Sequence, residues 1–369
     1  MFFKIVLSIV MSVGIYVSLH AYSAFAVKFS NRAAVLMTLI VFALSQFFWV
    51  NFFLRFRYGI RLPVEVMNAC YIIFAFFGIL AMVFIVLDVL WLTGIRFENH
   101  ARQAVFAAAL AGILMVYGMI NAHITRFSTH EIAVDKPGIN AKVVFLSDTH
   151  IGNSSVTMRR MQRAVNDINA LQPDLVIFGG DIFDNVVTPF VAKYAPVFNQ
   201  LSPKHGVFAI LGNHEYYGEG VEQAVQAFQD WGFTVLRDEK VRIPQLNLTL
   251  VGLDDPGRFT GNETKKSILT KDLTPGDLQV VAVHRPTPRN ADVAELYGNV
   301  DAVLAGHSHN GQMFPINLIV RRMFKNAWGA AKFGDTWLIT TSGLGLWGPQ
   351  VRIGSRSEIM VLNFTSKNK

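Results

Sequence analysis

The stretch Gly306-His307-Ser308-His309 places two imidazoles one residue apart at the end of an apolar run. Alternate residues of an extended segment point to the same side, so His307 and His309 can both face one site. Many histidines instead lie singly on a surface or in a core. The pair alone therefore does not decide between a metal site and ordinary histidines.

Four other apolar runs in the chain end in the same way, with Asp, His or Asn beside glycine or in a tight loop. Sites in α/β sheets form at the carboxyl ends of strands. Five such ends in one chain are hard to explain as satisfied polar residues of a core, so we expect their side chains to meet. The residues concerned in the other four runs are Asp148 and His150, Asp181 and Asp184, Asn213 to Glu215, and His284.

These side chains supply oxygen and nitrogen donors of intermediate hardness, which suit Mn, Fe or Zn rather than an ion that prefers thiolates. The single cysteine, Cys70, lies in an apolar run far from them in sequence. A shared carboxylate can bridge two ions about 3.5–4 Å apart, and two such ions can clamp a phosphoryl oxygen. The pattern therefore favours a dinuclear site for phosphoryl chemistry.

The pattern D-x-H, G-D-x-x-D, G-N-H-E, H and G-H-x-H, over roughly residues 140–310, resembles that of the calcineurin-like metallophosphoesterases. The resemblance implies a four-layer αββα sandwich with a dinuclear site at one edge. It also implies two divalent metal ions, with Mn favoured over Fe or Zn. By position, the first ion would bind Asp148, His150, Asp181 and His309, and the second would bind Asp181, Asn213, His284 and His307.

In this resemblance Asp181 bridges the ions, and Asp184 and Glu215 support the ligands from behind. His214 is not a ligand; it faces the substrate and stabilises the phosphoryl transition state or protonates the leaving oxygen. The implied reaction is in-line attack on phosphorus by a metal-bridging hydroxide, with the developing charge neutralised by the ions.

The elements that must position these residues begin at about Glu131, where short β-rich runs alternate with amphipathic stretches. An α/β domain over residues 126–369 is large enough for its own core. We expect strands at 142–146, 175–178, 207–211, 248–251, 280–283 and 302–304, and helices at 155–171, 221–231 and 291–296.

Residues 1–125 have a different composition and contain long apolar runs at about 2–27, 34–54, 67–92 and 104–124. Each is long enough to cross about 30 Å of hydrocarbon as a helix, so we expect a bundle of about four transmembrane helices. Burying four such helices in a soluble protein would need a very large core. The first run could instead be a cleaved signal peptide, because Ala24-Phe25-Ala26 resembles a cleavage site. Asp88 lies near the end of the third run and is expected to reach the membrane interface.

The charge pattern bears on location and partners. Basic residues in the loops weakly favour a cytoplasmic catalytic domain on the inner membrane of a bacterium. The net charge of +7 suits a protein beside anionic lipid, so the lipid bilayer is the expected partner. No basic stripe with interleaved aromatics and no nucleic-acid-binding motif occurs, so nucleic acid is not expected, and no protein partner is inferred.

The segment 314–334 mixes apolar and aromatic residues with Arg321, Arg322, Lys325 and Lys332. This composition fits a segment lying on a membrane interface, although a surface insertion packed on the sheet would explain it equally well. The membrane-attached phosphohydrolase branch resembles this chain most, both in Gly311-Gln312 and in "SGLGLWGPQVRIG". Arg352 in that stretch is a candidate phosphate contact or a plain surface charge.

The expected substrate is therefore a lipid-linked phosphodiester or pyrophosphate, with UDP-2,3-diacylglucosamine as one concrete candidate. Two alternatives remain open. The phosphoesterase domain could be a regulatory or binding module tethered to the membrane. The helices could instead carry a transport or scaffold role, with the enzyme as a passenger.

Overall fold

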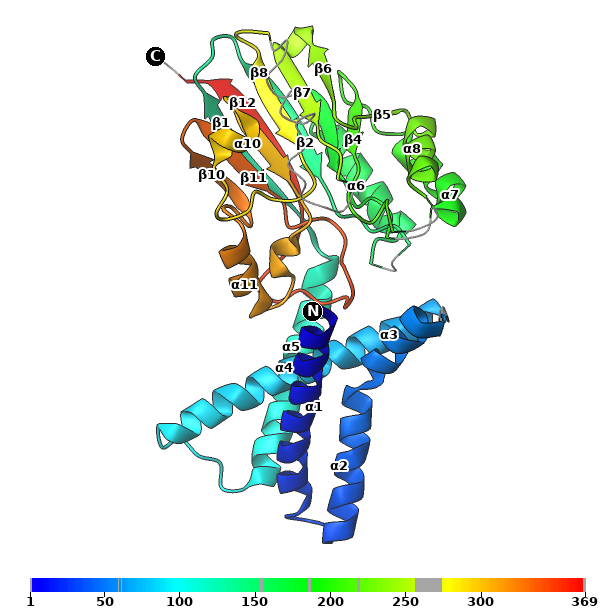
Figure 1. Ribbon diagram of the computed structural model, residues 1–369, viewed down its shortest axis with the longest axis vertical. Coiled ribbons are helices and arrows are strands. Elements are labelled where there is room, and N and C mark those ends of the chain that lie inside the picture. The colour runs from blue at the N-terminus through cyan, green and yellow to red at the C-terminus, as the bar shows by residue number, and fades with distance from the viewer. Residues whose placement is uncertain are drawn as a thin grey trace. The chain divides into compact units, whose positions relative to one another are not determined.

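The computed structural model describes residues 2–58, 60, 62–152, 155–184, 187–217, 220–255 and 274–367. The chain divides into two compact units. The helical unit comprises Met1–Asn121 with Gly348–Val351, and the α/β unit comprises Ala122–Trp347 with Arg352–Lys369. Figure 1 traces the elements of both units along the chain.

The helical unit is built from five helices in the described part of the chain. Three segments are long and apolar enough to span a membrane: Leu7–Phe25, Glu65–Leu92 and His100–His123. The helices are α1 (Phe2–Phe25), α2 (Asn31–Ser45), α3 (Phe47–Tyr58), α4 (Val64–Leu92) and α5 (His100–His123).

The run expected as a second spanning helix, 34–54, is divided between α2 and α3. The break lies at Gln46, whose backbone N–H is shared between the carbonyls of Phe42 and Ala43 at 3.2 Å each. The Gln46 side chain donates to Ser45 Oγ at 2.8 Å. With 15 residues, α2 is about 22 Å long, which is short of a bilayer core. We expected about four spanning helices. Among the described residues, three helices are candidates for spanning a membrane.

Asp88 on α4 has partners that the sequence did not predict. Its Oδ2 accepts a hydrogen bond from the Tyr16 hydroxyl at 2.5 Å and lies 3.1 Å from His20 Nε2. The His20 ring stacks on Phe84, with the centroids 4.1 Å apart. The carboxyl group therefore joins α4 to α1 through side-chain contacts, as polar groups do between apolar helices.

The α/β unit contains two six-stranded mixed sheets, ordered β1-β12-β2-β3-β4-β5 and β10-β11-β9-β8-β7-β6. The six strands expected from sequence are present as β2, β3, β4, β7, β8 and β9. The bounds in the first sheet are β1 (Thr125–Val134), β2 (Asn140–Leu146), β3 (Leu175–Gly179), β4 (Val207–Ile210), β5 (Phe233–Val235) and β12 (Ser357–Ser366). Those in the second are β6 (Glu239–Ile243), β7 (Leu248–Gly252), β8 (Leu278–Ala282), β9 (Ala302–Ala305), β10 (Gly329–Phe333) and β11 (Thr336–Thr340).

The side chains of each strand alternate between two cores, as the period of two requires. Val144 and Val176 pack under the helices that cover the first sheet, whereas Phe145 and Ile177 pack against the second sheet. A third core lies on the far face of the second sheet and includes Val281. The result is the layer order helix, sheet, sheet, helix. The covering helices are α6 (Met158–Ala170), α7 (Thr188–Phe198) and α8 (Val221–Asp230) on the first sheet and α10 (Val293–Tyr297) on the second.

The first sheet joins distant parts of the chain. β1 follows α5 directly and pairs in parallel with β12 along ten residues, from Thr125 opposite Ser357 to Val134 opposite Ser366. β12 in turn pairs antiparallel with β2. The strand nearest the C-terminus therefore lies inside the sheet, next to the strand that leads to Asp148.

Candidate dinuclear metal centre

The candidate ligands all lie just beyond strand ends. β2 leads to Asp148 and His150, and its parallel neighbours β3 and β4 lead to Asp181 and Asn213. In the second sheet, the parallel neighbours β8 and β9 lead to the remaining histidines, His284, His307 and His309. Parallel strands present their carboxyl ends at one edge, so both sheets contribute to one site.

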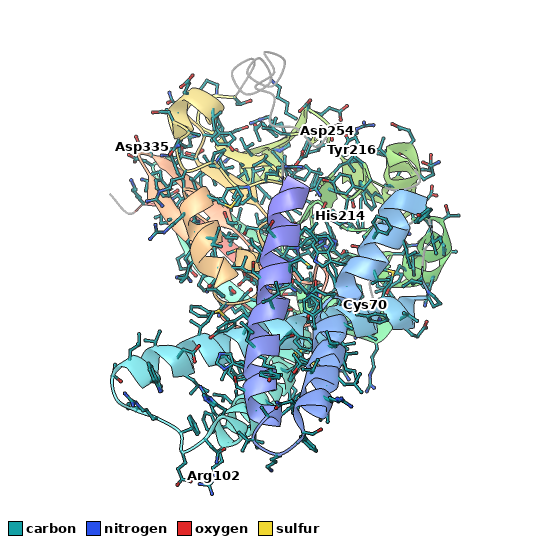
Figure 2. All side chains as sticks on the ribbon, turned by 60° about the horizontal axis from the view of Figure 1, so that its bottom comes forward. Cys70, Arg102, His214, Tyr216, Asp254 and Asp335 are labelled. Atoms are coloured by element: carbon teal, nitrogen blue, oxygen red, sulfur yellow. The ribbon has the colours of Figure 1, made fainter. Side chains whose placement is uncertain are left out.

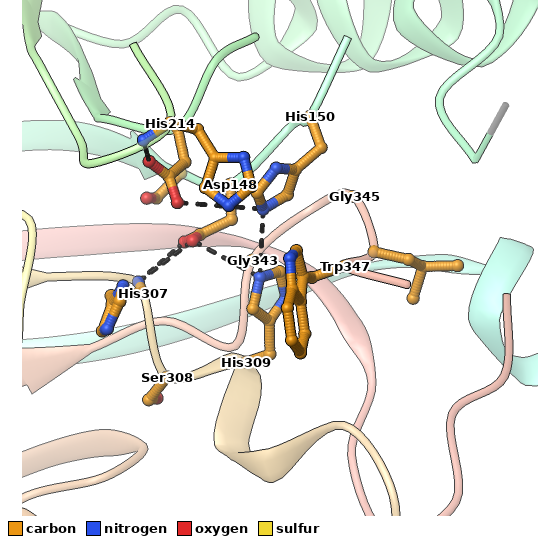
Figure 3. A network of polar contacts seen from close by, with 12 residues as sticks. Asp148, His150, His214, His307, Ser308, His309, Gly343, Gly345 and Trp347 are labelled. Carbon is orange, nitrogen blue, oxygen red and sulfur yellow. Dashed lines mark hydrogen bonds and ion pairs between the residues drawn. The ribbon is translucent and has the colours of Figure 1, made fainter. Parts of the chain in front are cut away.

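One group of donors consists of Asp148, His150 and His309, whose ligand atoms lie within 4.8 Å of one another. The Nε2 atoms of His150 and His309 are 3.2 Å apart, and His309 Nε2 is 3.5 Å from Asp148 Oδ1. All three side chains are buried. Figure 3 shows them converging on a common space.

A second group consists of Asp181, His284 and His307. His284 Nε2 lies 3.1 Å from Asp181 Oδ2, and the same oxygen is 3.9 Å from His150 Nε2 in the first group. Asp181 thus faces both groups, as a carboxylate shared between two ions would. A third set, His150, Asp184 and His214, also brings three potential donors together.

Buried atoms at the centre lack the partners that a purely structural role would give them. Asn213 is 4% exposed, and its Oδ1 accepts no hydrogen bond from the described residues. His284 Nδ1 faces the Gly179 carbonyl at 2.8 Å and must donate to it, which leaves Nε2 as the ring atom that faces Asp181 at 3.1 Å and could bind a cation once it is deprotonated. A backbone carbonyl that accepts from the other ring nitrogen in this way fixes the orientation of a metal-binding histidine. The donor set therefore fits two divalent cations.

The electrostatics of the centre also favour cations. Burial alone would lower the pKa of His284, but the carboxylate of Asp181 outweighs it, and the pKa rises to about 10. Burial and the neighbouring positive charge of His284 lower the pKa of His307 to about 3. In the metal-free chain a proton on His284 thus balances the buried carboxylates, and a bound cation would replace it.

The backbone at the centre is held in an uncommon conformation. Asp148, His150, Asp181, His307 and His309 all have φ between +46° and +61°. For residues other than glycine this left-handed backbone conformation is strained, and the strain costs about 1–3 kcal/mol per residue in sparsely populated regions. Residues strained in this way cluster at functional sites. The surrounding contacts must therefore hold these five residues in place.

Glycines let the ligand loops approach one another closely. A Cβ atom on Gly306 would lie 2.5 Å from Asp148 Oδ2, and one on Gly212 would lie 2.5 Å from the Asp181 nitrogen. Either contact would push a ligand loop away. This explains why both loops carry glycine directly before their ligands.

Glu215 organises the centre from behind. It is 2% exposed and accepts backbone N–H groups of Asp181 and Phe183 at 3.0 Å and of Gly212 at 2.7 Å. Burial and the negative charge of Asp181 raise the pKa of Glu215 to about 7, although the backbone amide donors by themselves lower it. Its carboxylate ties the loop after β3 to the loop after β4.

His214 lies beside the two donor groups. Its backbone N–H donates to Asp181 Oδ1 at 2.9 Å, and its ring is 4.6 Å from that of His150. The ring Nδ1 donates to the Asp184 carbonyl, and the Asp184 carboxylate is 3.5 Å from the same atom. Burial, together with His150, lowers the pKa of His214 below its ordinary value. With Nδ1 donating to a carbonyl, Nε2 is the ring atom left for proton exchange, and it can protonate a leaving oxygen only when the ring also carries a proton at Nε2.

The loop of His214 is secured by the residues that follow it. The Tyr216 hydroxyl donates to Asp254 Oδ2 at 2.6 Å, and both residues are labelled in Figure 2. Arg237 Nε donates to the same carboxylate at 3.2 Å. Tyr217 is 60% exposed, with its ring 5.3 Å from that of His214. Sequence reasoning did not identify these residues, because no motif marks them.

Arg352, the candidate phosphate contact, is fully buried. Its Nη2 donates to the carbonyls of Ser342 at 2.7 Å and Gly345 at 2.8 Å, and its Nη1 donates to Ser355 Oγ at 2.6 Å and reaches the His309 carbonyl at 3.4 Å. It is therefore not a plain surface charge. These contacts bind the guanidinium to the backbone around His309.

Comparison with known proteins places this centre in a wider context. Residues 141–311 match the family model described as calcineurin-like phosphoesterase. A Danio rerio protein named transmembrane protein with metallophosphoesterase domain is 31% identical over 276 residues, which cover 70% of this chain and 62% of the relative. The chain thus spans less than two thirds of that relative's length.

Two bacterial relatives are similar over comparable lengths. An uncharacterized metallophosphoesterase of Campylobacter jejuni is 27% identical over 73% of this chain and 72% of its own length. An uncharacterized metallophosphoesterase of Aquifex aeolicus is 28% identical over 70% of this chain and 98% of its own length.

Proposed function

The chain carries a calcineurin-like phosphoesterase domain, and on that premise we propose that it is a membrane-attached phosphohydrolase that uses two divalent metal ions. The observation that carries this proposal is the pair of buried donor groups that share Asp181. The otherwise unpaired Asn213 Oδ1 completes the second group.

The residues divide into holding and reacting roles. Asp148, His150 and His309 would hold one ion, and Asn213, His284 and His307 would hold the other, with Asp181 facing both groups. When bound, the ions supply positive charge that offsets the charge developing on the phosphoryl oxygens.

His214 is placed to assist the leaving group. Its Nδ1 is engaged by the Asp184 carbonyl, so Nε2 is the atom that exchanges a proton with the leaving oxygen. Asp184 Oδ1 is 3.4 Å from His150 Nδ1 and 3.5 Å from His214 Nδ1, so one carboxylate orients both rings.

The proposed substrate class is based on the rest of the chain. Three helices are long and apolar enough to span a membrane, and relatives from Danio rerio and Bos taurus are named transmembrane proteins. These features support a phosphodiester or pyrophosphate linked to a lipid. UDP-2,3-diacylglucosamine is the specific candidate, with manganese as the metal and the bacterial inner membrane as the location. Because nucleotide-linked lipid precursors are made in the cytoplasm, that substrate would require a catalytic domain on the cytoplasmic side.

The test is release of UMP from UDP-2,3-diacylglucosamine by the full-length protein in mixed micelles with manganese. The His214→Ala variant should keep its bound metal and lose roughly 10²–10⁴ in rate, the usual contribution of a general acid. The Asp181→Ala variant should lose both metal and activity. His205→Ala, at a histidine outside the centre, is the matched control and should behave as wild type.

Any other outcome would contradict one part of the proposal. If His214→Ala emptied the metal site, the role given to His214 would be wrong. Cleavage of an aryl phosphodiester without UMP release would keep the two-metal enzyme and discard this substrate. Binding of metal and substrate with no hydrolysis of either compound would support a regulatory module instead.

A further inference from the structure

Helix α11 (Ile316–Met323) presents an unusual face to solvent. In a surface helix the apolar stripe normally packs on the core. Here Ile316, Ile319 and Met323, which lie along one side, are 49%, 58% and 55% exposed, whereas Asn317 is only 6% exposed. Phe314, just before the helix, is 48% exposed. We call Phe314, Ile316, Ile319 and Met323 the α11 face.

Asn317 shows why the helix is oriented this way. Its side chain faces the α/β unit, where Nδ2 approaches the Gly354 carbonyl at 3.5 Å, and its N–H donates to the Met313 carbonyl at 3.3 Å. The polar residue thus supplies the anchoring contact. The apolar residues are left without a covering layer in the described part of the α/β unit.

The α11 face is joined to the candidate metal centre through a short, hydrogen-bonded path. His309 begins the turn that leads to Gln312, whose side chain donates to the Trp347 carbonyl at 3.0 Å and accepts the Trp347 N–H at 3.1 Å. The Phe314 N–H donates to the Ile353 carbonyl at 2.7 Å. Trp347 is 61% exposed and is drawn beside His309 in Figure 3. The segment before α11 and the backbone of Trp347 are therefore joined by hydrogen bonds to the turn that begins at His309.

Charge identifies what could cover this surface. Arg321 and Arg322 are exposed, and helix periodicity places Arg321 on the side of α11 opposite the apolar stripe and Arg322 about a quarter turn from it. No described acidic side chain forms an ion pair with either of them. Lys325 follows two residues after the helix. A short helix with exposed aliphatic residues on one side, arginines on the remaining surface and an exposed tryptophan nearby suits the boundary between acyl chains and anionic head groups.

We propose that the α11 face and Trp347 insert into the surface of an anionic phospholipid bilayer. The helical unit of the same chain contains three candidate membrane spans, so a bilayer is an apolar surface that the chain is expected to meet. Docking would present the metal centre to the lipid surface. This inference goes beyond the proposed function, because it holds whether the substrate is lipid-linked or soluble.

The test uses the full chain in proteoliposomes, with phosphatidylcholine alone or with added phosphatidylglycerol. Cys70→Ala removes the single cysteine. A cysteine introduced by Ile319→Cys or Met323→Cys then carries an environment-sensitive dye, and Thr234→Cys on the exposed side of β5 is the matched control. We expect a blue shift and quenching by acyl-brominated lipid at 319 and 323 but not at 234.

The charge dependence is tested with Arg321→Glu and Arg322→Glu together. Each basic residue near an anionic surface contributes about fivefold to binding, so the double reversal should lower the quenched fraction severalfold in anionic vesicles. It should change little in neutral vesicles. The matched control is Arg159→Glu with Arg163→Glu, at two exposed arginines of α6.

Three results would overturn the inference. Dyes at 319 and 323 that behave like the dye at 234 would show that the face stays in water. A blue shift that grows with protein density and ignores brominated lipid would indicate a second copy of the chain. Quenching only by a brominated diacyl substrate would assign the face to substrate acyl chains. No readout depends on catalysis, so failure here is separate from failure of the proposed function.

Discussion

Five candidate ligands adopt left-handed backbone, and the residues around them must hold that conformation. Arg352 is a fully buried support of this kind. Its guanidinium reaches three backbone carbonyls of the segment Ser342–Gly345 and the carbonyl of His309. A planar group with donors fixed in a fork suits such an arrangement, whereas a lysine ammonium does not.

We predict that Arg352→Met lowers the stability of the α/β unit by on the order of 3 kcal/mol, because it leaves buried carbonyls without donors. Bound metal should fall as well, since the backbone of His309 loses support. Denaturant unfolding and elemental analysis of the purified protein measure both. Arg352→Lys should restore only part of the loss.

Arg163→Met, at an exposed arginine on α6, is the control and should change stability little. If Arg352→Met kept full metal content and raised only KM, Arg352 would be a substrate contact, as one reading of the sequence has it.

At the scale of elements, β12 carries a second buried support. Glu358 is fully buried and accepts hydrogen bonds from the Ser342 N–H at 2.8 Å, Ser128 Oγ at 2.7 Å and Trp328 Nε1 at 2.7 Å. Arg356 Nε adds a contact at 3.2 Å. The carboxylate thereby joins β1, β12 and the segment that packs beside Asp148.

Burial opposes ionisation of Glu358, but these hydrogen bonds outweigh burial and lower its pKa below the ordinary value. A carboxyl group whose pKa is lower in the folded state contributes stability above its unfolded pKa. That contribution is lost as pH falls through the folded pKa. We predict that Glu358→Gln is less stable than wild type by about 1–3 kcal/mol at pH 7, and that the gap narrows towards acid.

Melting temperatures of both proteins from pH 7 down to pH 4 measure this effect. Glu239→Gln, at an exposed position on β6, serves as control. Parallel curves for wild type and Glu358→Gln at every pH would contradict the role given to the ionised carboxylate.

The elements also show which features a sequence can predict. The strands β2, β3, β4, β8 and β9 were readable because each is a short apolar run that ends in a metal-binding motif. β1 was missed because "TRFSTHEIAV" alternates polar and apolar residues and pairs only with distant β12. The break at Gln46 was missed because one polar residue barely changes the hydropathy of a long run.

The sequence pattern named the donor residues that the structure brings together and named Asp184 and Glu215 behind them, but it did not identify Arg352 or Glu358 as supports. Asp148, His150 and the others carry a local pattern in fixed spacing. Arg352 and Glu358 act through contacts with segments remote in sequence, and nothing local distinguishes them from surface charges. Contacts between segments that lie far apart in the sequence cannot be read from a local pattern of residues.

At the scale of the whole molecule, each of the two units, taken by itself, has its own packed residues. The buried clusters of the α/β unit draw on both sheets and their helices, and the helical unit is built from contacts among α1 to α4. We predict that metal stabilises only the α/β unit. A ligand present at 100 times its dissociation constant adds about 2.7 kcal/mol, which corresponds to roughly 5–10 °C for a domain of this size.

Calorimetry of the full chain in detergent, with manganese and then with EDTA, measures this shift. One transition should move and another should stay. The Asp181→Ala variant should show neither shift. Equal movement of all transitions on chelation would mean that the two units unfold as one.

The position of β12 inside the first sheet has a consequence for biosynthesis. The ribosome completes every candidate ligand, from Asp148 to His309, before it makes the strand that lies between β1 and β2. At about 5–20 residues per second the remaining stretch to Ser366 takes several seconds. During that interval the edges of β1 and β2 have no partner from β12. The nascent chain therefore emerges with its apolar helices already made, and its first sheet stays divided between β1 and β2 until β12 has been made.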